Sequence, residues 1–257
     1  MKILFYIALM LCLAVLPSNA TNQQTDSLEC LKQQADSAYS KEDFANAEKM
    51  YLQLASNGES VSVFYNLACS YYRMNDIPKA ILWFERAALL DPSDDDIRFN
   101  LAMARSKTID RIIPRHENFF VSSWHSIMQT SSVSEWAYYA LFSFAITLMF
   151  LGVYMFCQSV LLRKIGFFGA LVFLFGCVLF NLLALSVRSQ NNNKSSAIIM
   201  APAVTVRSTP TQSGTDLFLI HEGTKVEIRD NSISDWAEIQ IADGKVGWVE
   251  KSTFETI

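Results

Sequence analysis

Two long stretches without a charged residue dominate this sequence of 257 residues. They are residues 136–162 and residues 165–187, and only Arg163 and Lys164 separate them. Each stretch is longer than the roughly 20 apolar residues that a helix needs to cross a hydrocarbon core of about 30 Å. Because lipid offers the backbone no hydrogen-bond partners, we expect two antiparallel spanning helices joined by a tight dibasic turn.

The composition of these stretches also predicts how the two helices pack. Asn181 is costly in lipid, so we expect it to face the partner helix. Counting equal distances back from the dibasic turn places Asn181 opposite Thr147 or Ser143. Gly169 and Gly176 supply the small side chains that allow two helices to approach closely.

The N-terminus is typical of a signal peptide. Lys2 precedes an apolar run of about fourteen residues, and small residues end the segment at Ala20. The run is shorter than a membrane span, which favours cleavage after residue 20 over a permanent anchor. Positive residues near membrane ends prefer the cytoplasm, and no Lys or Arg lies in the 15 residues before Trp136. Both lines of argument put the dibasic turn in the cytoplasm and the flanking modules outside.

Residues 28–108 carry apolar side chains at helical spacing, and the pattern repeats along the chain. A small residue, an aromatic residue and a second apolar residue recur at the same intervals, and an Asn-Leu-Ala triplet returns 34 residues later. The matching positions are Ala47, Tyr51 and Leu54 with Ala80, Phe84 and Ala87, and Asn66 to Ala68 with Asn100 to Ala102. The segment resembles tetratricopeptide repeats: two helix pairs and a further helix, near the minimum for a continuous core.

An Asn followed seven residues later by a cation occurs twice at equivalent repeat positions. The pairs are Asn66 with Arg73 and Asn100 with Lys107, and two helical turns put each pair on one face. The resemblance implies a groove in which such residues, with Lys32 as an addition, hold an extended peptide. Two solvated polar faces inherited from a duplicated repeat are the alternative.

Three acidic residues after Pro92 have a simpler interpretation. Asp94, Asp95 and Asp96 fall where the next helix begins, and negative charge is favoured at a helix N-terminus. We expect an N-cap and first turn there, in place of an acidic binding patch.

Residues 109–135 are expected to form an interfacial segment. Phe120, Trp124 and Ile127 share a helical face, and aromatic side chains favour the headgroup region of a membrane. A plain linker is the alternative. Upstream, Cys30 and Cys69 would face an oxidising compartment, where either a disulfide or two separate thiols would be compatible with the sequence.

After a polar linker at 188–197, residues 198–257 alternate short strands with turn signals. Asp243-Gly244 between two such strands predicts a tight hairpin with positive φ at both residues. The Val-x-Val-Arg-x-x-Pro start, the Glu-Gly-Thr-Lys-Val strand and the Asp-Gly-x-x-Gly-Trp-Val ending resemble bacterial SH3 domains. Because some relatives bind cell-wall peptide or glycan, the resemblance makes Trp236 and Trp248 candidate ligand contacts. Both are also framework positions of such a barrel.

Composition and motifs argue against several classes of function. The formal net charge of −4 and the lack of a basic stripe exclude nucleic acid as an expected partner. Three scattered histidines give no metal-ligand spacing, and no Cys–His or Ser–His–Asp arrangement is apparent. We therefore expect no enzyme and no cofactor.

The order of the modules resembles the E-type proteins of the aerotolerance (Bat) operons of Bacteroidetes and other bacteria. The resemblance includes residues 109–114 before the membrane and residues 163–168 at the turn. It implies partners among membrane proteins with von Willebrand factor A domains and, indirectly, a MoxR-type ATPase.

The predicted fold class is thus a multidomain membrane protein: an α-helical tetratricopeptide repeat array, a two-helix transmembrane hairpin and a small all-β SH3-like barrel. The predicted function is a scaffold for protein–protein interactions, with both soluble domains on the periplasmic side of the bacterial inner membrane. The alternative is a tether or sensor that binds peptidoglycan through the barrel.

Overall fold

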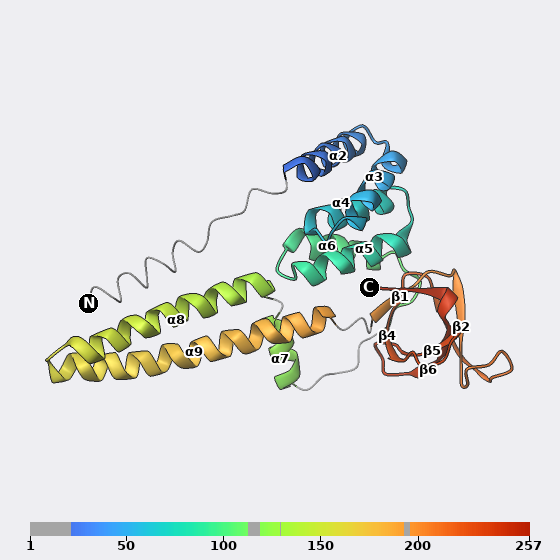
Figure 1. The fold of residues 1–257 in the computed structure, drawn as a ribbon. Coiled ribbons are helices and arrows are strands. Elements are labelled where there is room, and N and C mark those ends of the chain that lie inside the picture. Colours follow the sequence, from blue (N-terminus) through green and yellow to red (C-terminus); the bar gives the residue numbers. More distant parts are fainter. Residues whose placement is uncertain (1–21, 113–118, 129, 193–195) are drawn as a thin grey trace.

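The computed structural model describes residues 22–112, 119–128, 130–192 and 196–257. The expected signal peptide at residues 1–20 lies outside them. Three parts are evident in Figure 1: a stack of helices, a long two-helix hairpin and a curled β-sheet. The predicted fold class is confirmed in these three parts.

The helical stack consists of five antiparallel helices that pack in chain order. They are α2 (Asn22–Ser40), α3 (Phe44–Ser56), α4 (Val61–Arg73), α5 (Ile77–Leu90) and α6 (Asp95–Arg105). Small residues lie at the closest contacts, since Ala47, Ala68 and Ala80 are fully buried. Aromatic side chains fill the space between helices, and Tyr51 and Phe84 are each 1% exposed. The sequence pattern therefore marks the core of the stack.

The turns inside the two helix pairs are built alike. Asp43 and Asp76 cap the second helices by accepting hydrogen bonds from the backbone N–H groups of Asn46 and Lys79. The residue before each cap is left-handed, with φ of +62° at Glu42 and +63° at Asn75. These turns are 33 residues apart, so the first two repeats are in register at that offset.

The acidic run after Pro92 caps the fifth helix, as predicted. Asp94 Oδ1 accepts hydrogen bonds from the backbone nitrogens of Asp96 at 2.8 Å and Ile97 at 3.1 Å. Asp95 and Asp96 occupy the first turn, where the helix dipole favours a negative charge. This run therefore starts α6.

The hairpin consists of α8 (Val133–Phe156) and α9 (Val160–Asn192), and both helices are long and apolar enough to cross a membrane. Their outer faces are exposed along the whole hairpin, unlike the core helices of a soluble protein. The short helix α7 (Phe119–Met128) precedes them and contacts α9. Within it, Met128 is buried, while Trp124 and Ile127 remain exposed. That exposed face fits the interfacial interpretation.

The expected dibasic turn is wrong in position. The chain leaves α8 after Phe156 and re-enters a helix at Val160, so Arg163 and Lys164 lie inside the start of α9. Polar Gln158 and Ser159 make the turn, and the backbone N–H of Arg163 donates to the Ser159 carbonyl at 3.0 Å. The spans are thus displaced by several residues from 136–162 and 165–187.

The predicted contact of Asn181 with Thr147 or Ser143 is also wrong, and the displaced turn explains why. Asn181 is exposed, and its side chain donates to the carbonyl of Cys177 in its own helix at 3.0 Å. Its neighbour Phe180 stacks on Trp136 near the open end of the hairpin. A polar side chain at that level lies close to the aromatic belt, where it costs little.

The small residues of α9 do lie against α8. A side chain at Gly169 would meet the Phe150 ring, and one at Gly176 would meet Ser143 Oγ. Ser143 Oγ donates to the Phe173 carbonyl at 2.7 Å, and buried Thr147 bonds within its own helix. The polar contact across the hairpin is therefore made by Ser143.

The C-terminal sheet is antiparallel, with strand order β3-β2-β6-β5-β4-β1-β7. Its elements are β1 (Ser196–Ile199), β2 (Ala203–Arg207), β3 (Asp216–His221), β4 (Lys225–Asp230), β5 (Trp236–Gln240), β6 (Val246–Glu250), the 3₁₀ turn η1 (Lys251–Thr253) and β7 (Phe254–Thr256). The sheet curls around a core of alternating apolar side chains, such as Val206, Ile239 and Val249. The Asp243-Gly244 hairpin is present, but only Gly244 has positive φ, so its turn type differs from the predicted one.

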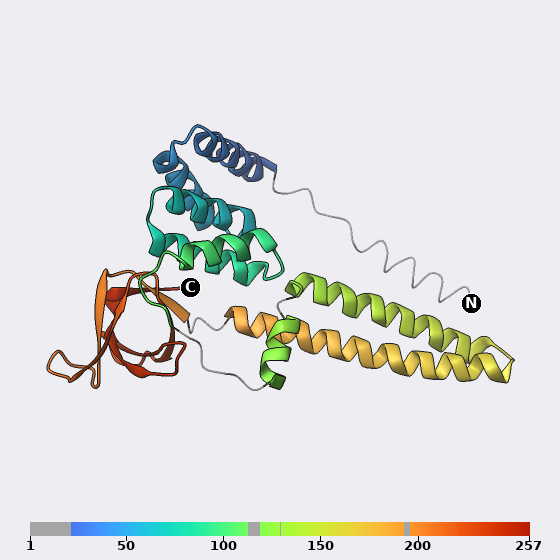
Figure 2. The same ribbon diagram turned by 180° about the vertical axis from the view of Figure 1, so that it is seen from behind.

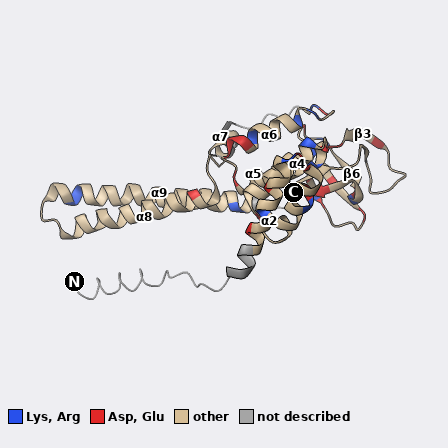
Figure 3. Ribbon diagram, turned by 90° about the horizontal axis from the view of Figure 1, so that it is seen from above, with Lys and Arg blue, Asp and Glu red and all other residues tan. Residues whose placement is uncertain are grey.

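Both soluble modules lie at the open end of the hairpin, opposite its turn, as Figures 1 and 2 show. Charged side chains gather on these modules, whereas the hairpin is almost free of them between its ends (Figure 3). The shape therefore matches a U-shaped anchor with two modules on one side.

Candidate interaction sites

The first helices of the repeats are linked by side-chain hydrogen bonds. Asn66 on α4 donates to Asp36 Oδ1 on α2 at 3.3 Å, and Tyr51 on α3 donates to the same oxygen at 2.5 Å. Burial and this bond with Asp36 raise the pKa of the Tyr51 phenol. One step along the stack, Asn100 on α6 donates to Tyr65 Oη on α4 at 2.9 Å. The two predicted groove Asn residues thus connect neighbouring repeats.

The two cations paired with these Asn residues are held on aromatic rings. Arg73 lies over Phe44, 4.8 Å from the ring centre, and pairs with Glu42 at 3.4 Å. Lys107 lies over Tyr72 at 4.1 Å. Both remain exposed, so their positive charges are available on the surface of the stack.

Lys32 does not fit the predicted set. The 33-residue offset between the first two repeats aligns Lys32 with Tyr65 and places Gln33 in register with Asn66. The prediction used the 34-residue offset that relates the second and third first helices, where the connection from Asp91 to Ser93 adds a residue. Lys32 is half-buried and belongs to a different position of the repeat.

A second site joins the barrel to the repeats. Strand β1 contacts α5, and Ile198 on that strand is fully buried in the core of the helical stack. Its neighbour Ile199 is fully buried in the core of the barrel. Since successive side chains of a strand face opposite sides, β1 connects the two cores. A side chain at Gly223 would meet Thr108 and Ile81, so the surfaces approach closely there as well.

A buried carboxylate lies at the centre of this junction. Glu85 on α5 is 6% exposed, and its two oxygens pair with Arg105 on α6 and with Lys225 on β4, the latter at 2.8 Å. Burial opposes ionisation of Glu85, but Lys225 and Arg105 outweigh that effect and hold the pKa of the carboxyl below its usual range. At the edge of the same junction, Arg86 donates to Glu255 at 3.0 Å and to the Thr256 carbonyl at 2.7 Å.

A second carboxylate binds the barrel from the segment that follows α6. Asp110 accepts hydrogen bonds from the backbone nitrogen of His221 at 2.6 Å and from Thr224 Oγ1 at 2.8 Å, and its other oxygen lies 2.8 Å from His221 Nδ1. Burial alone would raise the pKa of Asp110, yet the hydrogen bonds from His221 and Thr224 hold it below its ordinary value. Ile112 then packs against the barrel core.

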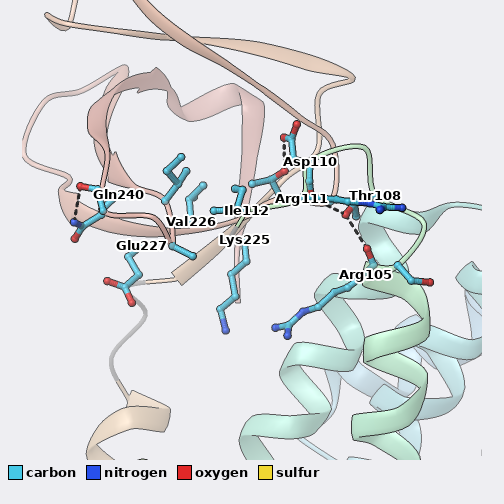
Figure 4. Close-up of a pocket in the computed structure, with 15 residues that line it drawn as sticks. Arg105, Thr108, Asp110, Arg111, Ile112, Lys225, Val226, Glu227 and Gln240 are labelled. Carbon is cyan, nitrogen blue, oxygen red and sulfur yellow. Dashed lines mark hydrogen bonds between the residues drawn. The ribbon is translucent and has the colours of Figure 1, made fainter. Parts of the chain in front are cut away.

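These elements enclose a cleft of about 730 Å³ between the segment 105–112 and the barrel. Figure 4 shows Arg105 and Lys225 extending side by side into the junction from opposite modules, with Arg111 and Ile112 between them and the barrel wall. Three cations and the two carboxylates Asp110 and Glu227 line it, so the cleft is polar. Within the described residues, no cluster of three or more His, Cys, Asp or Glu is placed to hold a metal ion.

Trp236 and Trp248 lie on the outer face of the barrel. They alternate with the buried residues Ala237 and Val249 along their strands, and neither belongs to the barrel core. Trp248 lies opposite Glu238 on the neighbouring strand. The interpretation of the two tryptophans as core residues is therefore wrong, and both are half-exposed to a ligand.

The cysteines of the repeats are free thiols, with Cys30 exposed and Cys69 half-buried. Burial raises the pKa of the Cys69 thiol to about 11, while a hydrogen bond with Tyr65 acts in the opposite direction. A thiol in that state is a poor nucleophile at neutral pH.

Comparisons with known proteins agree with the two soluble modules. Residues 61–94 match the family model of the tetratricopeptide repeat, and residues 202–255 match that of the bacterial SH3 domain. A search among curated proteins finds no relative of the chain. The matched repeat is α4 with α5, and the matched barrel begins after β1. The strand that docks onto the repeats is thus an addition at the N-terminal edge of the barrel match.

Sequence reasoning missed the junction residues. Asp110 and Lys225 belong to motifs that the sequence singled out, but nothing in the sequence indicates that these motifs meet across more than 100 residues. Glu85 follows the conserved-looking aromatic position of its helix and reads as a surface charge. A glutamate flanked by Phe84 and Ala87 in the second helix of a repeat was the only signal.

Proposed function

We propose that this protein is a membrane-anchored, non-enzymatic scaffold of the bacterial envelope that binds protein partners through the first helices of its repeats. Tetratricopeptide repeats and bacterial SH3 domains are both interaction modules, which supports a role in binding. The observation that carries the proposal is the pair of exposed cations, Arg73 and Lys107, held at equivalent repeat positions on aromatic rings. An acidic, extended segment of a partner would complement that face.

The two Asn residues have a supporting role in this proposal. Because Asn66 and Asn100 spend amide donors on Asp36 and Tyr65, they fix the spacing of the first helices. The cations are then held at a defined separation for a partner. The resemblance to aerotolerance-operon E proteins makes membrane proteins with von Willebrand factor A domains the partners to look for first.

A crosslinking experiment tests this proposal. The full-length protein in detergent is captured with its crosslinked partners, and Arg73→Glu with Lys107→Glu is compared with the unchanged chain. We expect the charge reversals to remove the captured membrane proteins, while Lys49→Glu on the exposed side of α3 leaves them in place. Unchanged capture by the double variant would contradict the proposal.

A second candidate function rests on the outward-facing tryptophans. Trp236 and Trp248 present aromatic surface outside the barrel core, as a glycan or peptide of the cell wall would require. The full-length protein should then sediment with purified peptidoglycan, and Trp248→Ala should reduce the bound fraction. Equal sedimentation of the variant would remove the tryptophan from this role.

A further inference from the structure

The hydrogen bonds around Asp110 have the features of a ligand-binding site. Three donors from one short turn of the barrel converge on a single carboxylate: the His221 backbone N–H, its ring Nδ1 and the Thr224 hydroxyl, all between 2.6 and 2.8 Å. For Nδ1 to bond a carboxylate, it must carry the ring proton. The turn therefore offers donors to both oxygens of one acid.

The residues around Asp110 lie on the barrel as an extended peptide would. Ile112 inserts its side chain against the barrel core, two residues after Asp110. On the other side, Thr108 fits against Gly223, where a Cβ would lie 2.7 Å from Thr108 Cγ2. Gly223 also has φ of +82°, so a larger residue would be strained there as well. The barrel thus has an acid pocket, an apolar pocket and a cleared backbone path.

The site selects for an acid by its donors. An Asn at position 110 would direct an NH₂ group at one of the two sets of donors, leaving a donor without an acceptor. Asp110 is also well covered, with 16% of its side chain exposed. An unmatched donor in such a position carries a desolvation cost that water removes only in part.

From this geometry we propose that the His221–Thr224 turn and the adjoining apolar pocket form a binding site for extended peptides of the type Asp-x-apolar, which the chain fills with its own segment 110–112. The ligand class is a carboxylate-bearing peptide, and the occupant seen in the structure is an intramolecular one. This site is separate from the first-helix face of the repeats and does not depend on the proposed function.

The short connection to α6 explains why the site stays filled. Asp110 follows the last residue of α6 by five positions, so its effective concentration at the barrel is of the order of millimolar or higher. A peptide from another protein must compete with that tether. Vacating the site should therefore strengthen binding of an added peptide by about tenfold or more.

The test uses a fluorescent synthetic peptide with the sequence of residues 107–114 and the full-length protein in lipid nanodiscs. In the chain that carries Asp110→Ala and Ile112→Ala, we expect anisotropy titrations to show binding at least about tenfold tighter than in the unchanged chain. The peptide in which Asn replaces the Asp should bind at least about tenfold more weakly to the same variant. Thr224→Val in the vacated chain should weaken the Asp peptide as well.

Hydrogen exchange of β5 and β6 checks that the barrel remains folded. If the double variant loses that protection, the single variant Asp110→Asn replaces it and the same comparisons decide. Absence of peptide binding to a folded, vacated barrel would overturn the proposal. Equal binding of the Asp and Asn peptides would overturn the acid pocket, and equal binding to the unchanged and vacated chains would overturn its occupation by residues 110–112. Charge reversal at Arg73 and Lys107 should change none of these values, so this proposal and the scaffold proposal fail independently.

Discussion

The hairpin and the junction between repeats and barrel both hold distant parts of the chain together, but by different means. In the hairpin, α8 and α9 meet through glycines, aromatic rings and the one polar contact across it from Ser143 that the described residues show. In the junction, Glu85 and Asp110 are buried or half-buried carboxylates, each bound by groups from the barrel. The hairpin depends on shape, and the junction depends on a few matched charges.

This difference predicts different responses to substitution. Removing one partner of a buried ion pair leaves a charge without compensation and is costly, although replacing the whole group by apolar residues is often harmless. Packing through small residues has no such pairing, so its cost depends only on whether an added atom fits. The following predictions test the two cases.

The largest effect is expected at Glu85. Arg105→Met with Lys225→Met would leave the Glu85 carboxylate buried and unpaired, at a cost of about 3–5 kcal/mol to the docked state. Adding Glu85→Met should restore most of the loss, because all three charges are then gone. Hydrogen exchange of β1 measures the opening in the full-length protein, and a double variant that exchanges like the unchanged chain would contradict the ion-pair account.

The next largest effect is expected at Ile198. Ile198→Ala removes side-chain volume from the core of the repeats and should cost roughly 2–5 kcal/mol, whereas Ile199→Ala removes it from the barrel core. The first variant should increase hydrogen exchange in α5 and the second in β5 and β6. If both variants loosened the same elements, β1 would not divide its faces between two cores.

A smaller effect is expected in the hairpin at Gly166. A Cβ there would lie 2.7 Å from the Tyr154 backbone nitrogen and 2.9 Å from the Phe150 carbonyl oxygen. Because backbone atoms cannot move aside, Gly166→Ala should cost about 1–3 kcal/mol in helix association. Gly152→Ala, with no atom within 4 Å of its Cβ, is the matched control. Thermal unfolding in detergent should separate the two, and equal midpoints would show that close approach at Gly166 is unimportant.

Acid should weaken the junction and spare the hairpin. Glu85 and Asp110 both have lowered pKa values when docked, by their cationic and hydrogen-bonding neighbours. Their stabilisation is therefore fully present above the ordinary carboxyl pKa of about 4 and is lost as the pH falls below it through the docked-state values. Exchange of β1, compared with helical content of the hairpin between pH 6 and pH 3, checks this. Undocking with rising pH would have the wrong sign.

The smallest effect is a gain of stability at the repeat turns. Glu42 adopts φ of +62°, which costs a residue with a side chain about 1–2 kcal/mol. Glu42→Gly removes that strain, and we expect a net gain of about 0.5–1 kcal/mol after the entropy of glycine and the loss of the exposed pair with Arg73. Asn75→Gly should gain less, since Asn tolerates this conformation. Thermal unfolding of the full-length protein measures both, and a loss at Glu42 would contradict the strain.

Much of the fold was predictable because it depends on local properties of the chain. Helical periodicity located the stack, chargeless length located the hairpin, and alternation with turn residues located the barrel. The errors arose where one residue of register matters. Displacement of the hairpin turn from Arg163 to Gln158 moved the residue opposite Asn181 from Thr147 to the level of Trp136.

The candidate sites were predictable only in part. Asn66 and Asn100 follow from repeat spacing, but their partners Asp36 and Tyr65 lie on other helices. Glu85 was not predictable, because its burial results from a barrel that docks onto the repeats from more than 100 residues away. Side chains whose role depends on long-range docking leave no periodic pattern in a single sequence.

The central claim is that repeats and barrel form one rigid unit at the open end of the hairpin. Pulsed electron spin resonance between labels at Lys49→Cys on α3 and Gln212→Cys on the barrel, with the native cysteines replaced, tests it most directly in nanodiscs. We predict one narrow distance distribution that broadens with Arg105→Met and Lys225→Met. A broad distribution in the otherwise unchanged chain would contradict a rigid junction.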